Sequence, residues 1–167
     1  MARTAWRFAQ AHCPFASRAV GLHAWLAHRN ARHTMVRGEA MIVAGIGLRA
    51  GASWQEVVEL ISLAVTKAAL SLDDIDRLAT LDIRADEAGF TTAARHLKLP
   101  AIAVPAEAMR AIAPSVRTHS SRVEALHGVG SVAEASALAA AGKDARLLLR
   151  RIASTRVTCA LAQGVFP

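Results

Sequence analysis

The sequence predicts an α/β protein with a three-layer α/β/α arrangement around a small mixed, mostly parallel sheet. Residues 41–46 form an apolar run that breaks into a glycine turn, and a helical pattern begins at Trp54. Such a run is typical of a buried strand that leads into a helix. Two further short apolar runs, at 77–81 and 101–104, each precede another helical segment. Strands that alternate with helices through short links favour a parallel sheet covered by helices.

The last part of the chain predicts an antiparallel addition to this sheet. Apolar runs at 145–149 and 156–162 flank the short polar link 153–155. Strands joined by so short a link form a hairpin and run in opposite directions. The hairpin therefore makes the predicted sheet mixed.

Two helices are predicted from the same start signal. Residues 53–56 and 131–134 both read Ser-x-x-Glu, the pattern of a capping box. In a capping box the serine hydroxyl accepts the third amide of the helix, and the glutamate reaches back to the serine amide. We expect the first helix to end near Leu70 and the second at Gly142.

Two more helices are expected between them. Residues 86–97 begin with two acidic residues, and their apolar spacing predicts a helix with one buried face. A further helix should begin at Pro105 and end near Pro114. The polar residues 115–121 are predicted to form a surface loop.

Composition limits the class of protein. A chain of 167 residues, 53% of them hydrophobic, can bury a sizeable core. Because no apolar run approaches the ~18 residues that a membrane span needs, we expect no membrane partner and a cytoplasmic location. The two cysteines, Cys13 and Cys159, cannot build a zinc site of ordinary spacing. We therefore predict no metal and no cofactor, with Cys159 as a small core residue.

The positive charge belongs mainly to the first 40 residues. The chain carries a net +7, and residues 1–40 hold six arginines against one glutamate, which leaves +2 for residues 41–167. The body has no dense basic stripe with interleaved aromatic residues, so we predict no nucleic-acid partner. We treat 1–40 as a basic extension and 41–167 as the folded domain. The extension has the composition of an organelle leader, or it precedes the native start at Met41 or Met35.

Ligands of open α/β sheets bind at the carboxyl ends of the strands. That rule collects residues 47–53, 80–87 and 104–107, and the glycine turn 127–131 could join them. Two capped helix N-termini follow glycine turns and could bind anions, and Arg49 could contact a carboxylate or phosphate. The candidate substrate-binding residues are Gly45, Gly47, Arg49, Gly51, Ser53, Thr80, Asp82, Asp86, Glu87, Gly128, Gly130 and Ser131.

Structural interpretations of the same residues stay open. The pattern in 45–51 is one residue too long for a dinucleotide fingerprint, so its glycines could serve only tight turns and close packing. The two Ser-x-x-Glu patterns are helix caps first. The acidic cluster in 82–87 could be a solvated helix start, or it could act in acid–base or metal chemistry. The sequence has neither a G-x-S-x-G elbow nor an HExxH motif, so no nucleophile is evident.

Four motifs in order resemble one known family. They are residues 45–51 (GIGLRAG), 78–87 (LATLDIRADE), 128–134 (GVGSVAE) and 157–162 (VTCALA). Together they resemble the CobE family, which is equivalent to the C-terminal domain of the CbiG cobalamin-biosynthesis proteins. The resemblance covers 41–167 and implies a compact α/β/α fold with a mixed sheet. CobE-like members are stand-alone proteins of the oxygen-dependent route to cobalamin.

The resemblance also implies a ligand. It favours an accessory protein that binds a carboxylate-rich corrin-ring intermediate, such as a precorrin or hydrogenobyrinic acid. The family commonly has a cysteine and a second arginine in the first turn, where this chain has Leu48 and Ala50, so no thiol role is carried over. Other cobalamin-pathway enzymes, and a second copy in a homodimer, are further candidate partners.

An enzymatic alternative remains. CbiG is linked to opening a lactone and releasing a two-carbon fragment, but it carries N-terminal domains that this chain lacks. The alternative is a hydrolase that acts on a precorrin or cobalt-precorrin intermediate, with Asp82 or Glu87 as the base.

Overall fold

The computed structural model describes residues 40–142 and 144–165, and the expected basic extension lies outside these ranges apart from residue 40. The chain forms a five-stranded sheet in the order β3-β2-β1-β5-β4. The strands are β1 (Ala40–Leu48), β2 (Arg77–Leu81), β3 (Ala101–Val104), β4 (Arg146–Ala153) and β5 (Val157–Val165). Strands β1, β2 and β3 are parallel, and β5 is antiparallel to both β1 and β4. The predicted mixed sheet and its C-terminal hairpin are confirmed.

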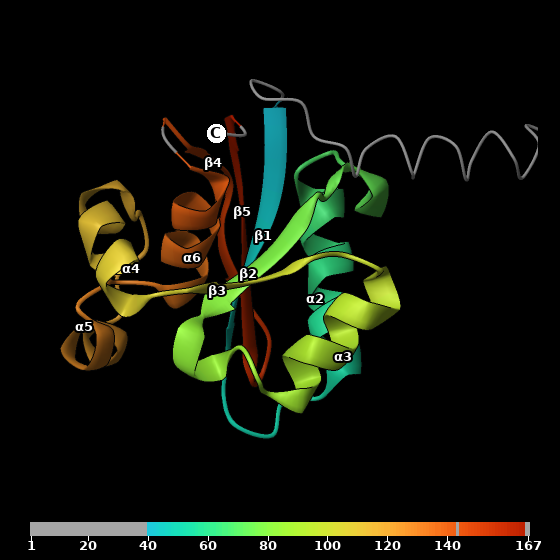
Figure 1. The fold of residues 1–167 in the computed structure, drawn as a ribbon, viewed down its shortest axis with the longest axis horizontal. Coiled ribbons are helices and arrows are strands. Elements are labelled where there is room, and N and C mark those ends of the chain that lie inside the picture. Colours follow the sequence, from blue (N-terminus) through green and yellow to red (C-terminus); the bar gives the residue numbers. More distant parts are fainter. Residues whose placement is uncertain (1–39, 143, 166–167) are drawn as a thin grey trace, which may run out of the picture.

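Helices cover both faces of the sheet, as the three-layer prediction requires (Figure 1). The α-helices are α2 (Trp54–Lys67), α3 (Ala88–Leu97), α4 (Ala106–Ile112), α5 (Ser121–His127) and α6 (Val132–Ala141). Short 3-10 turns lie at η1 (Leu72–Asp74), η2 (Asp82–Arg84) and η3 (Ala113–Ser115). Helices α2 and α3 lie on one side of the sheet, and α4, α5 and α6 lie on the other.

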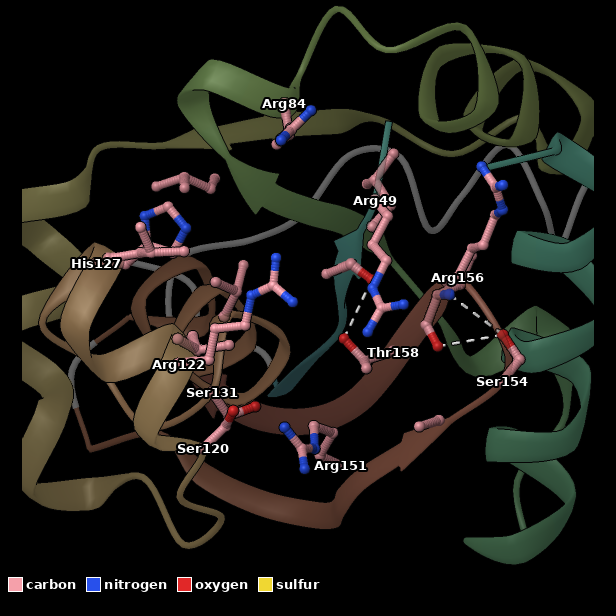
Figure 2. A pocket seen from close by; sticks show the side chains of 18 of the residues that line it. Arg49, Arg84, Ser120, Arg122, His127, Ser131, Arg151, Ser154, Arg156 and Thr158 are labelled. Carbon is pink, nitrogen blue, oxygen red and sulfur yellow. Dashed lines mark hydrogen bonds between the residues drawn. The ribbon is translucent and has the colours of Figure 1, made fainter. Parts of the chain in front are cut away.

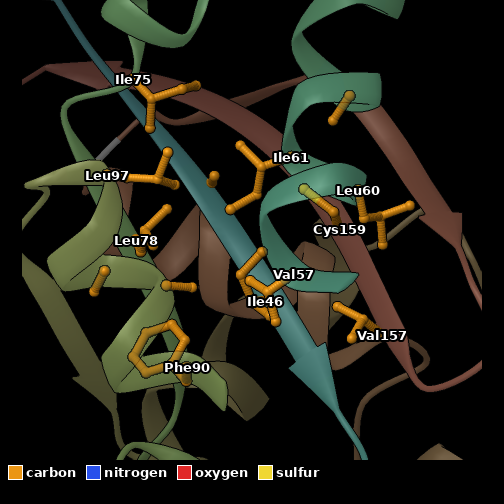
Figure 3. Close-up of a cluster of buried hydrophobic side chains, with 14 of the residues drawn as sticks. Ile46, Val57, Leu60, Ile61, Ile75, Leu78, Phe90, Leu97, Val157 and Cys159 are labelled. Atoms are coloured by element: carbon orange, nitrogen blue, oxygen red, sulfur yellow. The ribbon is translucent and has the colours of Figure 1, made fainter. Parts of the chain in front are cut away.

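Two hydrophobic clusters hold these layers together. The first joins α2 and α3 to one face of β1 and β5, with Phe90 and Ile61 fully buried at its centre (Figure 3). Cys159 belongs to this cluster and is fully buried, as expected. The second cluster joins α4 and α6 to the opposite face. The two faces are separate because successive side chains of a strand point to opposite sides.

Helix α6 lies very close to the sheet backbone at two glycines of the sheet. Seven of its ten residues are buried, and most of them are alanine. A Cβ at Gly45 would collide with the carbonyl oxygen of Ala133, and one at Gly164 would collide with that of Ala141. Glycine is therefore required at both places for the helix to lie so close. This close packing brings the N-terminus of α6 to the carboxyl end of β1.

Residues 115–127 are only partly as predicted. The stretch expected as a surface loop, 115–121, is irregular at 116–120, between the turn η3 and the short helix α5, which was not predicted. Gly128 ends α5 in the left-handed conformation, at φ +72°. A helix of seven residues has too few turns for a clear apolar periodicity, which is why the pattern did not reveal it.

No helix within the described ranges is both long and apolar enough to cross a membrane.

Candidate functional site

A cleft of about 850 Å³ opens at the edge of the sheet where β1, β2 and β4 end. Ligand-binding sites commonly have volumes of roughly 300–1,000 Å³. Its walls come from the ends of β1 and β2, the helix α5, the start of α6 and the β4–β5 turn (Figure 2). The position agrees with the rule that ligands of α/β sheets bind at the carboxyl ends of strands.

The cleft is lined by cations. Five arginines from five parts of the chain border it, and they are Arg49, Arg84, Arg122, Arg151 and Arg156. None of the described residues that line the cleft is an aspartate or a glutamate. Charges of one sign in a concave site raise the local concentration of ligands of the opposite sign. The cleft is therefore suited to an anion.

The arginines differ in how they are held. The Nη1 of Arg84 forms an ion pair of 2.7 Å with Oε1 of Glu87. The Nη1 of Arg156 donates to the carbonyl oxygen of Ala50 at 3.1 Å, so this side chain is tied to the turn after β1. Figure 2 shows the guanidinium of Arg156 turned toward that side of the cleft.

The other three guanidinium groups point into the cleft. Figure 2 shows Arg49, Arg122 and Arg151 approaching its centre from the β1 turn, from α5 and from β4. Among the described residues, none forms an ion pair with these three. A guanidinium offers five N–H donors in a planar fork that fits a carboxylate. Three of them facing one space can hold several carboxylates of one ligand.

The N-terminus of α6 forms part of the floor. Ser131 caps the helix, and its Oγ accepts from the N–H of Glu134 at 3.4 Å. Backbone N–H groups in the first turn of a helix carry a partial positive charge. Gly47 lies against this turn, and a Cβ there would come within 2.5 Å of Oγ1 of Thr158. That hydroxyl donates to the carbonyl of Gly47 at 3.1 Å.

Apolar side chains complete the lining. Leu48, Val123, Leu126 and Val132 border the cleft together with the arginines. Leu126 on α5 is 68% exposed and borders this space. The cleft therefore combines an apolar wall with cationic ends.

Two glutamates fasten the walls. Glu134 of α6 is fully buried and accepts N–H groups from Arg117 (2.7 Å), Thr118 (3.0 Å) and Arg151 (2.9 Å), as well as the hydroxyl of Thr118. Burial by itself would raise the pKa of Glu134, but the N–H of Arg151 and the donors on Thr118 and Arg117 together hold the pKa below its ordinary value. The carboxylate is therefore charged at neutral pH.

The second glutamate fastens the β4–β5 turn. Oε1 of Glu56 accepts from the hydroxyl of Ser154 at 2.6 Å and from the N–H of Arg156 at 2.8 Å. The hydroxyl of Ser154 and then the N–H of Arg156 lower the pKa of this exposed carboxyl. Both glutamates were expected to reach back to their own serine amides. Each serine does cap its helix, but each carboxylate accepts from distant residues instead.

Three of the residues predicted from the sequence line the cleft, namely Gly47, Arg49 and Ser131. Gly128 and Gly130 lie in the turn before α6, behind the lining. Gly130 packs so tightly on residues 118–119 that a Cβ would lie 2.7 Å from the carbonyl oxygen of Thr118.

The other predicted residues lie outside the lining. Gly45 packs under α6, Gly51 forms the turn after β1 at φ +74°, and Ser53 caps α2. Of the two helix starts predicted from the capping pattern, that of α6 borders the cleft and that of α2 does not. Thr80 is fully buried and donates to the carbonyl of Ile46 at 2.8 Å.

The acidic cluster also lies outside. Oδ1 of Asp82 accepts the N–H of Ile83 at 2.7 Å, Asp86 is exposed, and Glu87 pairs with Arg84. No group of metal-ligating side chains occurs among the described residues. Burial raises the pKa of the Cys159 thiol to about 12, so this cysteine stays protonated.

The candidate residues named from the sequence left out most of the arginines, although the range 80–87 collected from the strand ends includes Arg84. Arg84, Arg122, Arg151 and Arg156 come from a 3-10 turn, an unpredicted helix and the two sides of a hairpin turn. The rule about strand ends applied to β4 as well, because β4 runs in the same direction as β1. Applying it there would have found Arg151.

The fold and the cleft define the class: an α/β/α protein with a cationic cleft at the carboxyl ends of its strands. Residues 42–162 match the family described as cobalamin synthesis G C-terminus. Protein CobE of a Sinorhizobium species is 35% identical over 123 residues, which are 74% of this chain and 80% of that protein. The chain belongs to this family of cobalamin-biosynthesis proteins.

Solved structures agree with this assignment. The crystal structure of CobE, a protein from the cobalamin (vitamin B12) biosynthetic pathway, matches with a TM-score of 0.73 and 29% identity over 81% of this chain and 98% of that chain. Cobalamin biosynthesis protein chiG of Agrobacterium tumefaciens matches with a TM-score of 0.60 and 37% identity, over 73% and 97%. A putative cobalamin biosynthesis protein G homolog of Sulfolobus solfataricus gives 0.59 and 26%, over 74% of this chain and 36% of its own.

Proposed function

We propose that the protein binds a carboxylate-rich corrin-ring intermediate of cobalamin synthesis in the arginine-lined cleft, in an accessory role. The observation that carries this proposal is the charge of the lining, which has five arginines and no carboxylate among the described residues. Family membership supports a ligand from this pathway.

The chemistry of the ligand matches the chemistry of the cleft. A corrin-type intermediate is an apolar macrocycle with acetate and propionate groups around its rim. Arg49, Arg122 and Arg151 can each bind a rim carboxylate in a two-pronged contact. Leu126 and Val123 offer the apolar surface that a macrocycle needs. The N–H groups at the start of α6 can take a further carboxylate.

The hydrolase alternative finds no support in the cleft. Asp82 and Glu87, the two candidate bases, do not line it, and each already has a protein partner. A general base must come within hydrogen-bond reach of the proton that it removes.

Titration of the protein with hydrogenobyrinic acid, followed by the absorbance of the macrocycle, tests the proposal. We expect saturable binding below ~100 μM, and affinity that falls as salt is raised because the contacts are ionic. Cyanocobinamide, whose rim groups are amidated, is the ligand control and should bind much more weakly. Equal affinity for the two ligands would contradict a role for the arginines.

Adjacent residues of β4 supply a matched pair of variants. Arg151 lines the cleft, whereas its neighbour Arg150 is exposed and does not. Arg151→Ala should weaken binding about tenfold, the ~1.4 kcal/mol of one charge-assisted contact. Arg150→Ala removes the same charge from the same strand and should change affinity little. Equal losses would mean that only net charge matters and that the cleft is not the site.

A further inference from the structure

The buried glutamate of α6 contacts neither solvent nor the cleft, yet it lies between two of the cleft's walls. Glu134 is 0% exposed and is the only carboxylate among the buried residues of the described chain. A buried charge is retained only where donors surround it. Its donors come from two segments, residues 117–118 and residue 151, which are far apart in the sequence.

One oxygen of the carboxylate joins the two segments. Oε1 accepts both the hydroxyl of Thr118 and the N–H of Arg151, and Oε2 accepts the N–H groups of Arg117 and Thr118. The bonds to Arg117 and Arg151 use backbone N–H groups. Glu134 therefore fixes the position of the β4 backbone relative to the segment before α5.

Each of these segments carries arginine into the cleft. The chain at 117–120 leads directly into α5, whose Arg122 lines one wall, and the N–H of Ser120 donates to the carbonyl of Gly130 at 2.9 Å. Arg151 itself projects from β4 into the opposite wall. β4 is irregular at this point, because its pairing with β5 shifts between Leu149 and Ile152. Regular pairing with β5 is interrupted around Arg151, and the carboxylate holds its N–H.

We propose that Glu134 is a positioning residue for the cleft, which holds the backbones of Arg151 and of the segment leading to Arg122 at the spacing that a polyanionic ligand needs. This inference rests on the proposed function for the identity of the ligand. The tie between the walls can be measured without any ligand.

The first measurement is amide hydrogen exchange in Glu134→Gln, read by NMR. The amide of Gln keeps one oxygen acceptor and puts an N–H donor in place of the other, so it cannot accept from residues 117–118 and from residue 151 at once as the carboxylate does. The N–H of Arg151, or those of Arg117 and Thr118, should therefore lose protection by about tenfold or more. Ser136→Ala is the control, because Ser136 is also fully buried on α6 but bonds to the carbonyls of Ala79 and Ala133. It should leave those three amides protected. Unchanged exchange in Glu134→Gln overturns the proposal.

The second measurement is a double-mutant cycle on affinity for hydrogenobyrinic acid. If Glu134 acts through the placement of Arg151, Glu134→Gln should weaken binding about tenfold in the native background and much less in Arg151→Ala. A merely destabilising change would weaken binding equally in both backgrounds, and that result overturns the positioning role. If Glu134→Gln does not fold, Thr118→Val removes only the hydroxyl donor and should show the same pattern at smaller size.

The two failures are distinguishable. If the native protein binds no hydrogenobyrinic acid while the amides of either segment still lose protection in Glu134→Gln, the proposed ligand is wrong and the tie between the walls stands. If the native protein binds the ligand and the cycle shows no coupling, the proposed function stands and the positioning role is wrong.

Discussion

Helices α2 and α6 begin with the same pattern, Ser-x-x-Glu, and in both the serine hydroxyl accepts the backbone N–H of the glutamate, at 3.2 Å and 3.4 Å. The glutamate side chains then differ. Glu56 lies at the surface and fastens the β4–β5 turn through one oxygen, whereas Glu134 is fully buried and uses both oxygens. The same Ser-x-x-Glu pattern therefore gives the two glutamates different tertiary roles, because their surroundings in the fold differ.

The largest expected difference between the two helices is in stability. Glu134→Gln should lower the free energy of unfolding by about 3 kcal/mol, because several buried N–H groups lose a charged acceptor. Urea denaturation measures this loss, and Ser136→Ala is the control for a buried polar change on the same helix. A loss no greater than that of Ser136→Ala would show that the carboxylate of Glu134 contributes little to stability.

The stability that Glu134 contributes should also depend on pH. The pKa of Glu134 lies below the ordinary 4.5 in the folded state, so its stabilisation is fully present above that value and is lost as the pH falls through the folded-state pKa. The stability difference between the native protein and Glu134→Gln should therefore shrink as the pH falls from about 5 to about 3. Denaturation at several pH values tests this. If this stability difference stays constant with pH, the charge of Glu134 does not stabilise the folded protein.

The serines sharpen the comparison because they should behave alike. Ser53→Ala and Ser131→Ala each remove one N-cap acceptor, so each should cost about 1 kcal/mol of stability. The same denaturation assay compares them. Two similar losses beside very different glutamate effects would separate the shared capping role from the separate tertiary roles. A large inequality would show that the caps are not equivalent.

The smallest effect is expected at Glu56. Glu56→Gln should leave global stability almost unchanged and speed amide exchange at Arg156, because this carboxylate is exposed and its bonds hold one turn. Glu59→Gln is the control, since Glu59 is exposed on the same helix. Global destabilisation as large as that of Glu134→Gln would remove the contrast between the two helices.

Much of the fold could be predicted because it depends on short-range patterns. The apolar runs that became β1, β2 and β3, and the hairpin of β4 and β5, are visible as local periodicity bounded by turns. Helix α5 was not visible, because it is short and polar and has no fully buried residue.

The candidate site was predicted only where it follows β1 or begins α6. Gly47, Arg49 and Ser131 could be found from the rule about strand ends and from the capping pattern. Arg122 and Arg151 were not found in this way, because each lies on an element whose position depends on contacts with residues far along the chain. No local pattern shows that these two arginines line the same cleft.

The sequence by itself determined the class of fold, the starts of the principal helices and the family, because each depends on residue types at fixed short spacing. The tertiary structure decided which charges share a space. Five arginines from separate segments meet in one cleft, where Glu87 pairs with Arg84 and no aspartate or glutamate of the described residues belongs to the lining. The physical reason is that the direction of a long polar side chain depends on the donors and acceptors that packing brings to it, and those come from residues far along the chain.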